Sequence, residues 1–294
     1  MSGYLALSVE LQGRDPEAAE AACFDAGALS VTLTDAVDDA ILEPAPGEVR
    51  LWPRTVLQAM FAADGAAPEA ILALARSLDV PASAIRAEHV RDRRWEREWL
   101  KDFHAMRFGR RLWVVPHHEP APEDADAVVV RLNPGLAFGT GTHATTALCL
   151  TWLDAHLKPG DTVIDYGCGS GVLAIAAARL GASRVDAFDI DPQALIATRD
   201  NAAANGVQER VFVHDTPATL PAACDVMLAN ILAGTLIELA QPLAAAVKPG
   251  GHLVLSGILR QQAHEVLAGY QSRLPLHVGG EREGWTLLAG IAPG

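Results

Sequence analysis

Hydrophobic and polar positions follow two different periods within the first ninety residues. From Tyr4 to Leu11 they alternate, which is typical of a half-buried strand. Asp15 and Pro16 then suit the N-cap and first turn of a helix that we expect to end at Gly27. The remaining predicted elements are strands from Leu29 to Leu33, Val49 to Phe61 and Ile85 to Val90, and a helix from Pro68 to Leu78. This βαββαβ order predicts a ferredoxin-like α+β domain.

From residue 127 onward, short apolar runs alternate with helical patterns. Such runs are typical of parallel strands that are covered on both faces, so we predict an open, Rossmann-like α/β sheet. The expected strands run from Val128 to Leu132, Thr162 to Tyr166, Arg184 to Phe188, Val211 to Val213, Val226 to Ala229 and His252 to Leu255. The expected helices run from Thr145 to His156, Gly171 to Leu180, Pro192 to Asn205, Leu232 to Val247 and Arg260 to Tyr270.

A densely charged segment separates the two patterns. The stretch from Arg91 to Phe103 is predicted to form a helix with Trp95 and Trp99 on one face, which we interpret as a connection packed against a neighbouring domain. A strand from Arg111 to Val115 follows it. We therefore expect a first domain over residues 1–90, a linker helix and connection over 91–110, and a second domain over 111–294.

Charge is distributed unevenly along this chain, whose formal net charge is −13. Residues 1–90 hold five basic and fourteen acidic side chains, whereas residues 91–111 hold eight basic and four acidic ones. A strongly acidic protein is not expected to grip nucleic acid through many phosphates. The basic stretch is either an RNA contact or, as we favour, a solvated helix face. The acidic first domain suits a basic protein partner.

No export signal is predicted, because the stretch from Met1 to Gln12 alternates and has no basic region followed by an apolar one. No membrane segment is predicted either, because no apolar run approaches the ~18 residues that a membrane span needs. The four cysteines are scattered without a CxxC pair, which argues against a disulfide framework and a zinc site. The histidines, including the pair His117 and His118, lack metal-ligand spacing. We expect a cytoplasmic monomer that binds no metal and no membrane.

The segment VIDYGCGSGV carries the clearest chemistry. An apolar strand ends in Gly167, Gly169 and Gly171 and passes straight into a helix, so the backbone can turn tightly and approach a ligand. Asp189 ends the next strand, where a carboxylate accepts hydrogen bonds from ribose hydroxyls. These features predict an adenosine-containing cofactor. A nicotinamide dinucleotide is the rival, but its fingerprint needs a third glycine where this chain has Val172, and the GxGxG spacing suits a cofactor without a pyrophosphate.

A second segment, NPGLAFGTGTHATT, precedes the helix that leads into this strand. We expect the loop to lie over the cofactor, with Phe138 against its flat or apolar part and hydroxyls such as that of Thr146 toward its polar groups. Thr145 is also a candidate N-cap for the helix. His143 is either a general base or, as is more common for a lone histidine, a structural residue of the loop.

A third segment, DVMLANILAG, is predicted to be a buried strand that ends in Asn230. An asparagine there faces the same crevice as the glycines, because ligands of open α/β sheets bind at the carboxyl ends of the strands. Its carbonyl oxygen can accept a hydrogen bond from a target amine and orient the lone pair, which would make Asn230 catalytic. Alternatively, Asn230 caps a helix from Leu232 onward, and the two roles can coexist.

Together these segments resemble the PrmA family of bacterial methyltransferases, which modify the eleventh protein of the large ribosomal subunit. The similarity begins near WEREWLKDFHAMRF, runs through the three segments and reaches LSGIL at Ser256. DxGxGxG alone is common to many methyltransferases, whereas FGTGTHATT combined with ANILAG is far more specific.

The resemblance implies a class I methyltransferase sheet, S-adenosylmethionine as cofactor, and methylation of lysine ε-amines and the N-terminal α-amine of that ribosomal protein. It implies cofactor contacts from Thr146, Gly167, Asp189 and Asn230, with Phe138 and His143 in the loop over the cofactor. It also implies that the first domain recognises the substrate. No direct contact with nucleic acid is expected. A methyltransferase that acts on RNA or on a small-molecule amine is the alternative.

Overall fold

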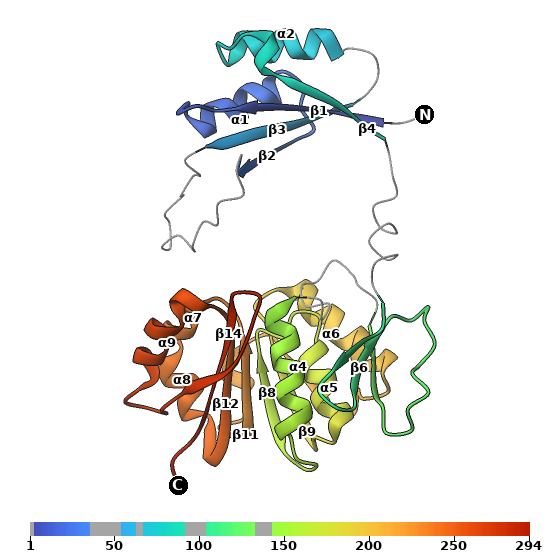
Figure 1. Ribbon diagram of the computed structural model, residues 1–294, viewed down its shortest axis with the longest axis vertical. Coiled ribbons are helices and arrows are strands. Elements are labelled where there is room, and N and C mark those ends of the chain that lie inside the picture. The colour runs from blue at the N-terminus through green and yellow to red at the C-terminus, as the bar shows by residue number, and fades with distance from the viewer. Residues whose placement is uncertain (1–2, 36–53, 63–66, 92–103, 133–142) are drawn as a thin grey trace. The chain divides into compact units, whose positions relative to one another are not determined.

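The computed structural model describes residues 3–35, 54–62, 67–91, 104–132 and 143–294, and the chain forms two compact units, residues 1–98 and 99–294 (Figure 1). In these described ranges, the helices are too short or too polar to cross a membrane. The start of the strand expected at Val49, the Trp95 and Trp99 helix, and Phe138 with its loop lie outside the described residues.

The first unit has the ferredoxin-like fold that its hydrophobic pattern predicts. It consists of β1 (Gly3–Glu10), α1 (Pro16–Asp25), β2 (Ser30–Asp35), β3 (Thr55–Ala62), α2 (Ala67–Ser77), a 3₁₀ turn η1 (Ala82–Ala84) and β4 (Arg86–Arg91). The strands form an antiparallel sheet in the order β2-β3-β1-β4, so each helix connects two strands that flank a third. Leu7, Leu57 and Leu74 are fully buried where the helices cover the sheet.

The second unit is built on a seven-stranded sheet in the order β10-β9-β8-β11-β12-β14-β13. The sheet strands are β8 (Thr162–Tyr166), β9 (Arg184–Phe188), β10 (Val211–His214), β11 (Cys224–Asn230), β12 (Val247–Leu259), β13 (His277–Arg282) and β14 (Trp285–Ile291). The helices are α4 (Ala144–His156), α5 (Val172–Leu180), α6 (Pro192–Ala204), α7 (Ala233–Glu238), α8 (Ala240–Ala245) and α9 (Ala263–Tyr270), with 3₁₀ turns η3 (Pro217–Thr219) and η4 (Arg260–Gln262). Strands β8 to β12 are parallel, which confirms the predicted α/β sheet, and β14 and β13 extend it in antiparallel fashion.

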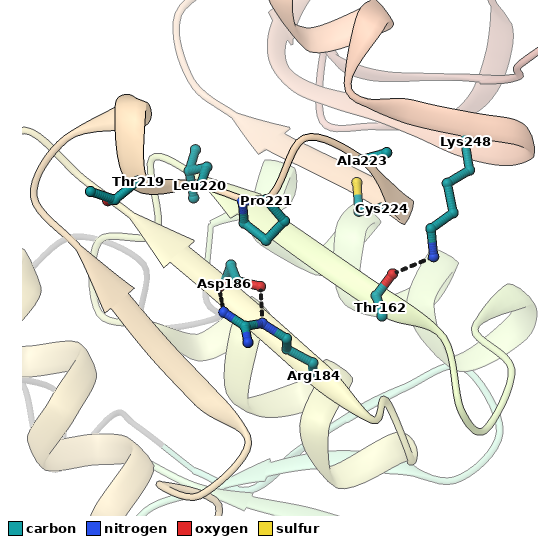
Figure 2. Close-up of a pocket in the computed structure, with 9 residues that line it drawn as sticks. All are labelled: Thr162, Arg184, Asp186, Thr219, Leu220, Pro221, Ala223, Cys224 and Lys248. Atoms are coloured by element: carbon teal, nitrogen blue, oxygen red, sulfur yellow. Dashed lines mark hydrogen bonds and ion pairs between the residues drawn. The ribbon is translucent and has the colours of Figure 1, made fainter.

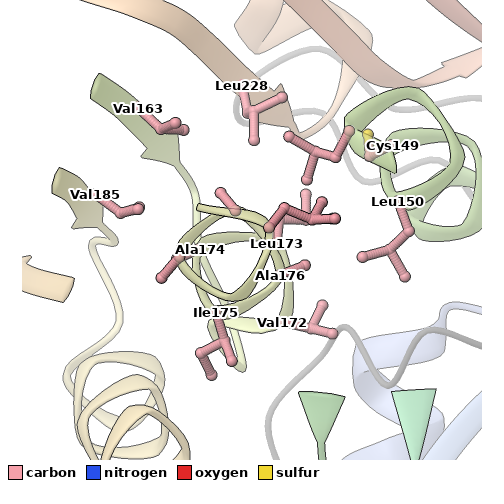
Figure 3. Packing of buried hydrophobic residues seen from close by; sticks show 14 of the residues in the cluster. Cys149, Leu150, Val163, Val172, Leu173, Ala174, Ile175, Ala176, Val185 and Leu228 are labelled. Atoms are coloured by element: carbon pink, nitrogen blue, oxygen red, sulfur yellow. The ribbon is translucent and has the colours of Figure 1, made fainter. Parts of the chain in front are cut away.

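Helix α5 lies at the centre of this unit. All of its residues except Arg179 are buried, as expected of a helix that is apolar on every side. Its side chains pack between strand residues such as Val163 and Leu228 and helix α4, to which Leu150 belongs (Figure 3). Helix α5, which follows the glycine turn, therefore lies within the main hydrophobic core of the unit.

The pattern placed Val128 to Leu132 in the main sheet, and this is wrong. Strand β7 (Val128–Arg131) instead joins β5 (Met106–Phe108) and β6 (Leu112–Val115) in a separate three-stranded sheet. There, β7 covers the outer side of α5, whose Arg179 Nε donates to the Val129 carbonyl at 3.1 Å. An apolar run predicts a strand but not the sheet that it joins. Strand β5 falls within the stretch that we interpreted as a linker.

The expected single helix from Leu232 to Val247 is two helices, α7 and α8, which meet at Leu239. Pro242 explains the break, because it has no N–H to donate to the carbonyl of Glu238 four residues earlier. The hairpin of β13 and β14 was not predicted, although Trp285 to Ile291 is rich in apolar residues.

Asp15 caps helix α1, since its side chain accepts a hydrogen bond from the Glu17 N–H at 3.1 Å. We expect Asp15→Ala to destabilise this helix by about 1 kcal/mol, because the N–H loses its partner. Hydrogen exchange of the α1 amides in the full chain should become faster, and Asp15→Ser should restore their protection. Unchanged exchange in Asp15→Ala would contradict the capping role.

Candidate active site

The order of the strands reverses between β8 and β11, which are neighbours at the centre of the sheet. Their register pairs Tyr166 with Ala229, so the next residues, Gly167 and Asn230, lie beside each other at the carboxyl edge. Open α/β sheets bind their ligands at such a reversal. The glycine segment and the asparagine therefore lie side by side at the edge where we predict the cofactor crevice.

Each of the three glycines after β8 has a backbone that disfavours a side chain. Gly167, Gly169 and Gly171 have φ angles of 83°, 54° and 78°. A Cβ at Gly167 would collide with the side chain of Ile231, and one at Gly171 would lie 2.8 Å from side-chain atoms of Thr198. At Gly167 and Gly171 the neighbouring side chains therefore leave no room for a larger residue.

Helix α6 and strand β9 hold this loop in place. The N–H groups of Gly167 and Cys168 donate to the Phe188 carbonyl at 2.8 and 3.0 Å. Thr198 Oγ1 donates to the Gly169 carbonyl at 3.0 Å and lies 3.4 Å from the Cys168 thiol. A second α6 side chain, Asn201, donates to the loop at 2.9 Å. The loop is thereby fixed from the side of β9 and α6.

Asp189 follows β9 and faces the glycine loop. Its Oδ2 accepts from the Gly169 N–H at 2.8 Å, and its Oδ1 accepts from the Asp191 N–H at 3.0 Å. Each carboxylate oxygen has a second lone pair, so the group can still accept hydrogen bonds from hydroxyls of a ligand.

Asp165 lies beneath the loop, where it is fully buried. Its Oδ2 accepts from the Ala174 N–H at 3.0 Å, in the first turn of α5. Because the N-cap of α5 is Gly171, which has no side chain, the strand carboxylate satisfies a helix donor in its place. Burial raises the pKa of Asp165 to about 7, and the charge of Asp189 acts in the same direction.

Two hydrogen bonds join the start of α4 to the strand ends. Asn230 Nδ2 donates to Thr146 Oγ1 at 3.4 Å. Ser256, which pairs with Asn230 in the register of β11 and β12, donates from Oγ to the Thr145 carbonyl at 3.2 Å. The first contact uses the nitrogen of the Asn230 amide, so the amide oxygen is the end available to a ligand.

The model of one protein family, described as "Ribosomal protein L11 methyltransferase (PrmA)", matches residues 3–292. The chain belongs to the PrmA family. A Pseudomonas aeruginosa protein named ribosomal protein L11 methyltransferase is 50% identical over 290 residues, which is 98% of each chain. One from Azotobacter vinelandii with the same name is 51% identical over 269 residues, 90% of this chain and 91% of its own.

A solved structure agrees with this assignment. The ribosomal protein L11 methylase from Lactobacillus delbrueckii subsp. bulgaricus is 34% identical, with a TM-score of 0.60 over 65% of this chain and all of its own. The PrmA membership confirms that the protein is an S-adenosylmethionine-dependent methyltransferase, and the nicotinamide alternative is not supported.

The crevice of this PrmA-family protein gathers most of the residues that the sequence singled out. The glycines, Asp189, Asn230 and Thr146 share the carboxyl edge through the hydrogen bonds described above. His143 lies at the start of α4, where its ring meets that of Trp285 edge-on with centroids 4.9 Å apart. Phe138 lies outside the described residues.

Both capping alternatives fail. The N-cap of α4 is His143 and not Thr145, since the His143 side chain accepts from the Thr145 N–H at 3.4 Å. The N-cap of α7 is Leu232, which makes no side-chain capping bond, and Asn230 contacts Thr146 instead. The reason is the same at both places. Each helix begins one residue away from the predicted start, and each N-cap lies two residues away from the candidate.

Sequence reasoning missed Ile190. Its side chain is 87% exposed although it is large and apolar, and it stands between Asp189 and Asp191 beside the glycine loop. An apolar residue between two loop carboxylates, directly after a strand, is the signal that would have found it. Such a side chain offers a flat ligand group a surface to cover.

A cavity of about 400 Å³ lies at the opposite edge of the sheet, where the residues that open β9 and β11, Arg184 and Cys224, help to line it (Figure 2). The two basic side chains that line the cavity already form ion pairs with acidic side chains. Arg184 pairs with Asp186 at 2.7 Å, and Lys248 pairs with Asp225 at 2.9 Å. The cavity lies at the amino ends of the parallel strands and is not part of the crevice.

The raised pKa of Asp165 predicts a pH-dependent stability. Between pH 3.8 and about 7, the folded chain keeps a proton that the unfolded chain has lost, so stability falls as the pH rises through this window. The loss is up to about 4 kcal/mol, at about 1.4 kcal/mol for each pKa unit. Asp165→Asn should flatten this slope in urea unfolding of the second unit. An equal slope in both proteins would contradict the burial of a protonated carboxyl.

Proposed function

We propose that this chain transfers methyl groups from S-adenosylmethionine to lysine ε-amines and the N-terminal α-amine of ribosomal protein L11, with Asn230 orienting the amine. The main support for the proposal is that Gly167 and Asn230 are adjacent where the strand order reverses. A glycine backbone that can bind the cofactor thus lies beside an amide that can bind the substrate amine. The names of the PrmA relatives support the protein substrate over RNA or a small-molecule amine.

The residues of the crevice fit this cofactor. The glycine loop turns backbone without side chains toward it, and Asp189 has lone pairs for the two ribose hydroxyls. Exposed Ile190 suits the face of the adenine ring. Thr146 and Asn230 bound the crevice from the other side, and Phe138 and His143 remain expected contacts from the loop before α4.

Bound S-adenosylmethionine supplies a methyl group on a positively charged sulfur, which needs no further activation. The protein must therefore present a neutral amine in line with the methyl carbon, a task of orientation. Free lysine has a pKa of about 10.4, and removal from water in the crevice favours its neutral form. The Asn230 oxygen can accept one N–H of that amine and so direct its lone pair.

No strong base is required by this scheme. His143 is engaged in structure, because its Nδ1 lies 2.8 Å from Thr145 Oγ1 and accepts from the Thr145 N–H. Loss of the ammonium proton to water, helped by burial, gives the neutral amine before each transfer, and the methylated amine must lose a proton again before it can accept another methyl group.

The first unit is proposed to recognise L11. It folds as a compact body of its own, and residues 1–90 carry fourteen acidic against five basic side chains, which suits a basic ribosomal protein. We further propose that the enzyme acts as a cytoplasmic monomer without contacts to RNA.

Asp189 should contribute to the affinity for the cofactor. We expect Asp189→Ala to weaken S-adenosylmethionine binding in calorimetry by about 1–3 kcal/mol, the scale of a lost hydrogen bond to a charged group. Asp191→Ala is the matched control, because its side chain caps α6 at the Gln193 N–H and belongs to the same loop. Equal losses in both variants would assign the effect to the loop and not to the carboxylate.

Asn230→Ala should lower kcat for methyl transfer to L11 by about 100-fold or more while it changes cofactor affinity far less, since orientation is lost at the transition state. Asn230→Asp keeps the shape of the side chain but stabilises a protonated amine, so the rate of this variant should recover only at higher pH.

Transfer of a labelled methyl group to L11, to RNA and to small amines in cell extract tests the identity of the substrate. Label in RNA or a small amine, or full activity of Asn230→Ala, would refute the proposal.

A further inference from the structure

We propose that Gly257 on β12 is a positioning residue for Asn230. Its missing side chain lets the chain that follows Asn230 lie directly against the end of β12. The inference rests on the proposed function of Asn230, and it explains why a glycine stands within the LSGIL segment.

The collision that a side chain would cause at Gly257 involves backbone. Gly257 has a φ of +85°, and an added Cβ would strike the carbonyl oxygen of Ile231 and lie 2.8 Å from its carbonyl carbon and 3.2 Å from its nitrogen. No rotamer change relieves such a contact, so the chain at Ile231 would have to move.

The register makes this contact a neighbour of the crevice. Asn230 pairs with Ser256 at the last paired position of β11 and β12, and Ile231 and Gly257 are the residues that follow on each strand. Here β12 also departs from regular pairing with β14, because the register shifts between Leu255 and Ile258. At this irregular end of β12, Gly257 lies against the backbone of Ile231.

On the other side, the glycine loop confines Ile231. Its side chain is partly buried and lies so close to Gly167 that a Cβ there would collide with it. Gly167 is tied to the Phe188 carbonyl at 2.8 Å. A side chain at Gly257 would press on the carbonyl of the peptide that leads to Leu232 and, through the Ile231 nitrogen, on the peptide that joins Ile231 to Asn230.

A displacement of this peptide moves the Asn230 amide relative to the methyl donor. Misplacement of a reacting group by about 1 Å can lower a rate by about 100-fold. The cofactor loop, in contrast, is anchored by β9 and by Thr198 of α6. Gly257 should thus affect the alignment of the amine more than the binding of the cofactor.

Gly257→Ala tests the inference, with Gly250→Ala as its matched control. Gly250 lies in the same strand with a φ of +75°, but an added Cβ there has nothing within 4 Å, so both variants carry the same kind of backbone strain and only one collides. We expect Gly257→Ala to lower kcat with saturating L11 by about tenfold or more, with a calorimetric Kd for S-adenosylmethionine within about threefold of the natural chain. Gly250→Ala should change kcat by less than about twofold.

A kcat for Gly257→Ala within about threefold of the control, or equal losses in kcat and cofactor affinity, would overturn the inference. If Gly257→Ala does not fold, Ile231→Ala loosens the same segment from the other side, because it removes the side chain that lies against Gly167, and unchanged kcat in that variant is the overturning result. The role of Asn230 is tested separately. If Asn230→Ala is inactive and Gly257→Ala is not, only the positioning role of Gly257 fails. If Asn230→Ala is active, the proposed function fails and this inference fails with it.

Discussion

Close packing around the glycine segment at the carboxyl edge of β8 is the constraint on which the second unit depends. Three glycines at alternate positions, all with positive φ, carry the chain from a buried strand into α5, and only glycine adopts this backbone without strain. Because α5 is buried on nearly every side, the turn cannot be relaxed by moving the helix. The hydrogen bond from Ala174 to Asp165 then ties helix and strand together underneath the turn.

The same packing determines the surroundings of the two aspartates near the glycine loop, Asp165 and Asp189. The pKa of Asp165 is raised to about 7 by burial, so this carboxyl holds its proton across the acidic range. Asp165 accepts from the first turn of α5, whereas Asp189, which follows β9, accepts from the glycine loop. Their different depths therefore give the two aspartates different partners.

Most of the fold could be predicted because the decisive patterns are local. Strands β8 and β9 begin and end where their apolar runs do, and the glycine spacing indicated the crevice. What failed was non-local. The partner of Asn230 is Thr146, which lies 84 positions away, so neither the hydrogen bond nor the orientation of the amide follows from a pattern. The sheet that β7 joins likewise depends on the outer surface of α5. The break before Pro242 is different, because a proline inside a helical run is a local signal that our prediction overlooked.

The thiol of Cys168 has a consequence for an enzyme that handles an alkylating agent. This cysteine sits in the glycine loop, is only 6% exposed, and its pKa is raised, chiefly by burial. Sulfur is a strong nucleophile only as thiolate, so the raised pKa keeps it unreactive. The packing that shapes the glycine loop therefore also keeps this sulfur protonated and poorly nucleophilic beside the proposed cofactor site.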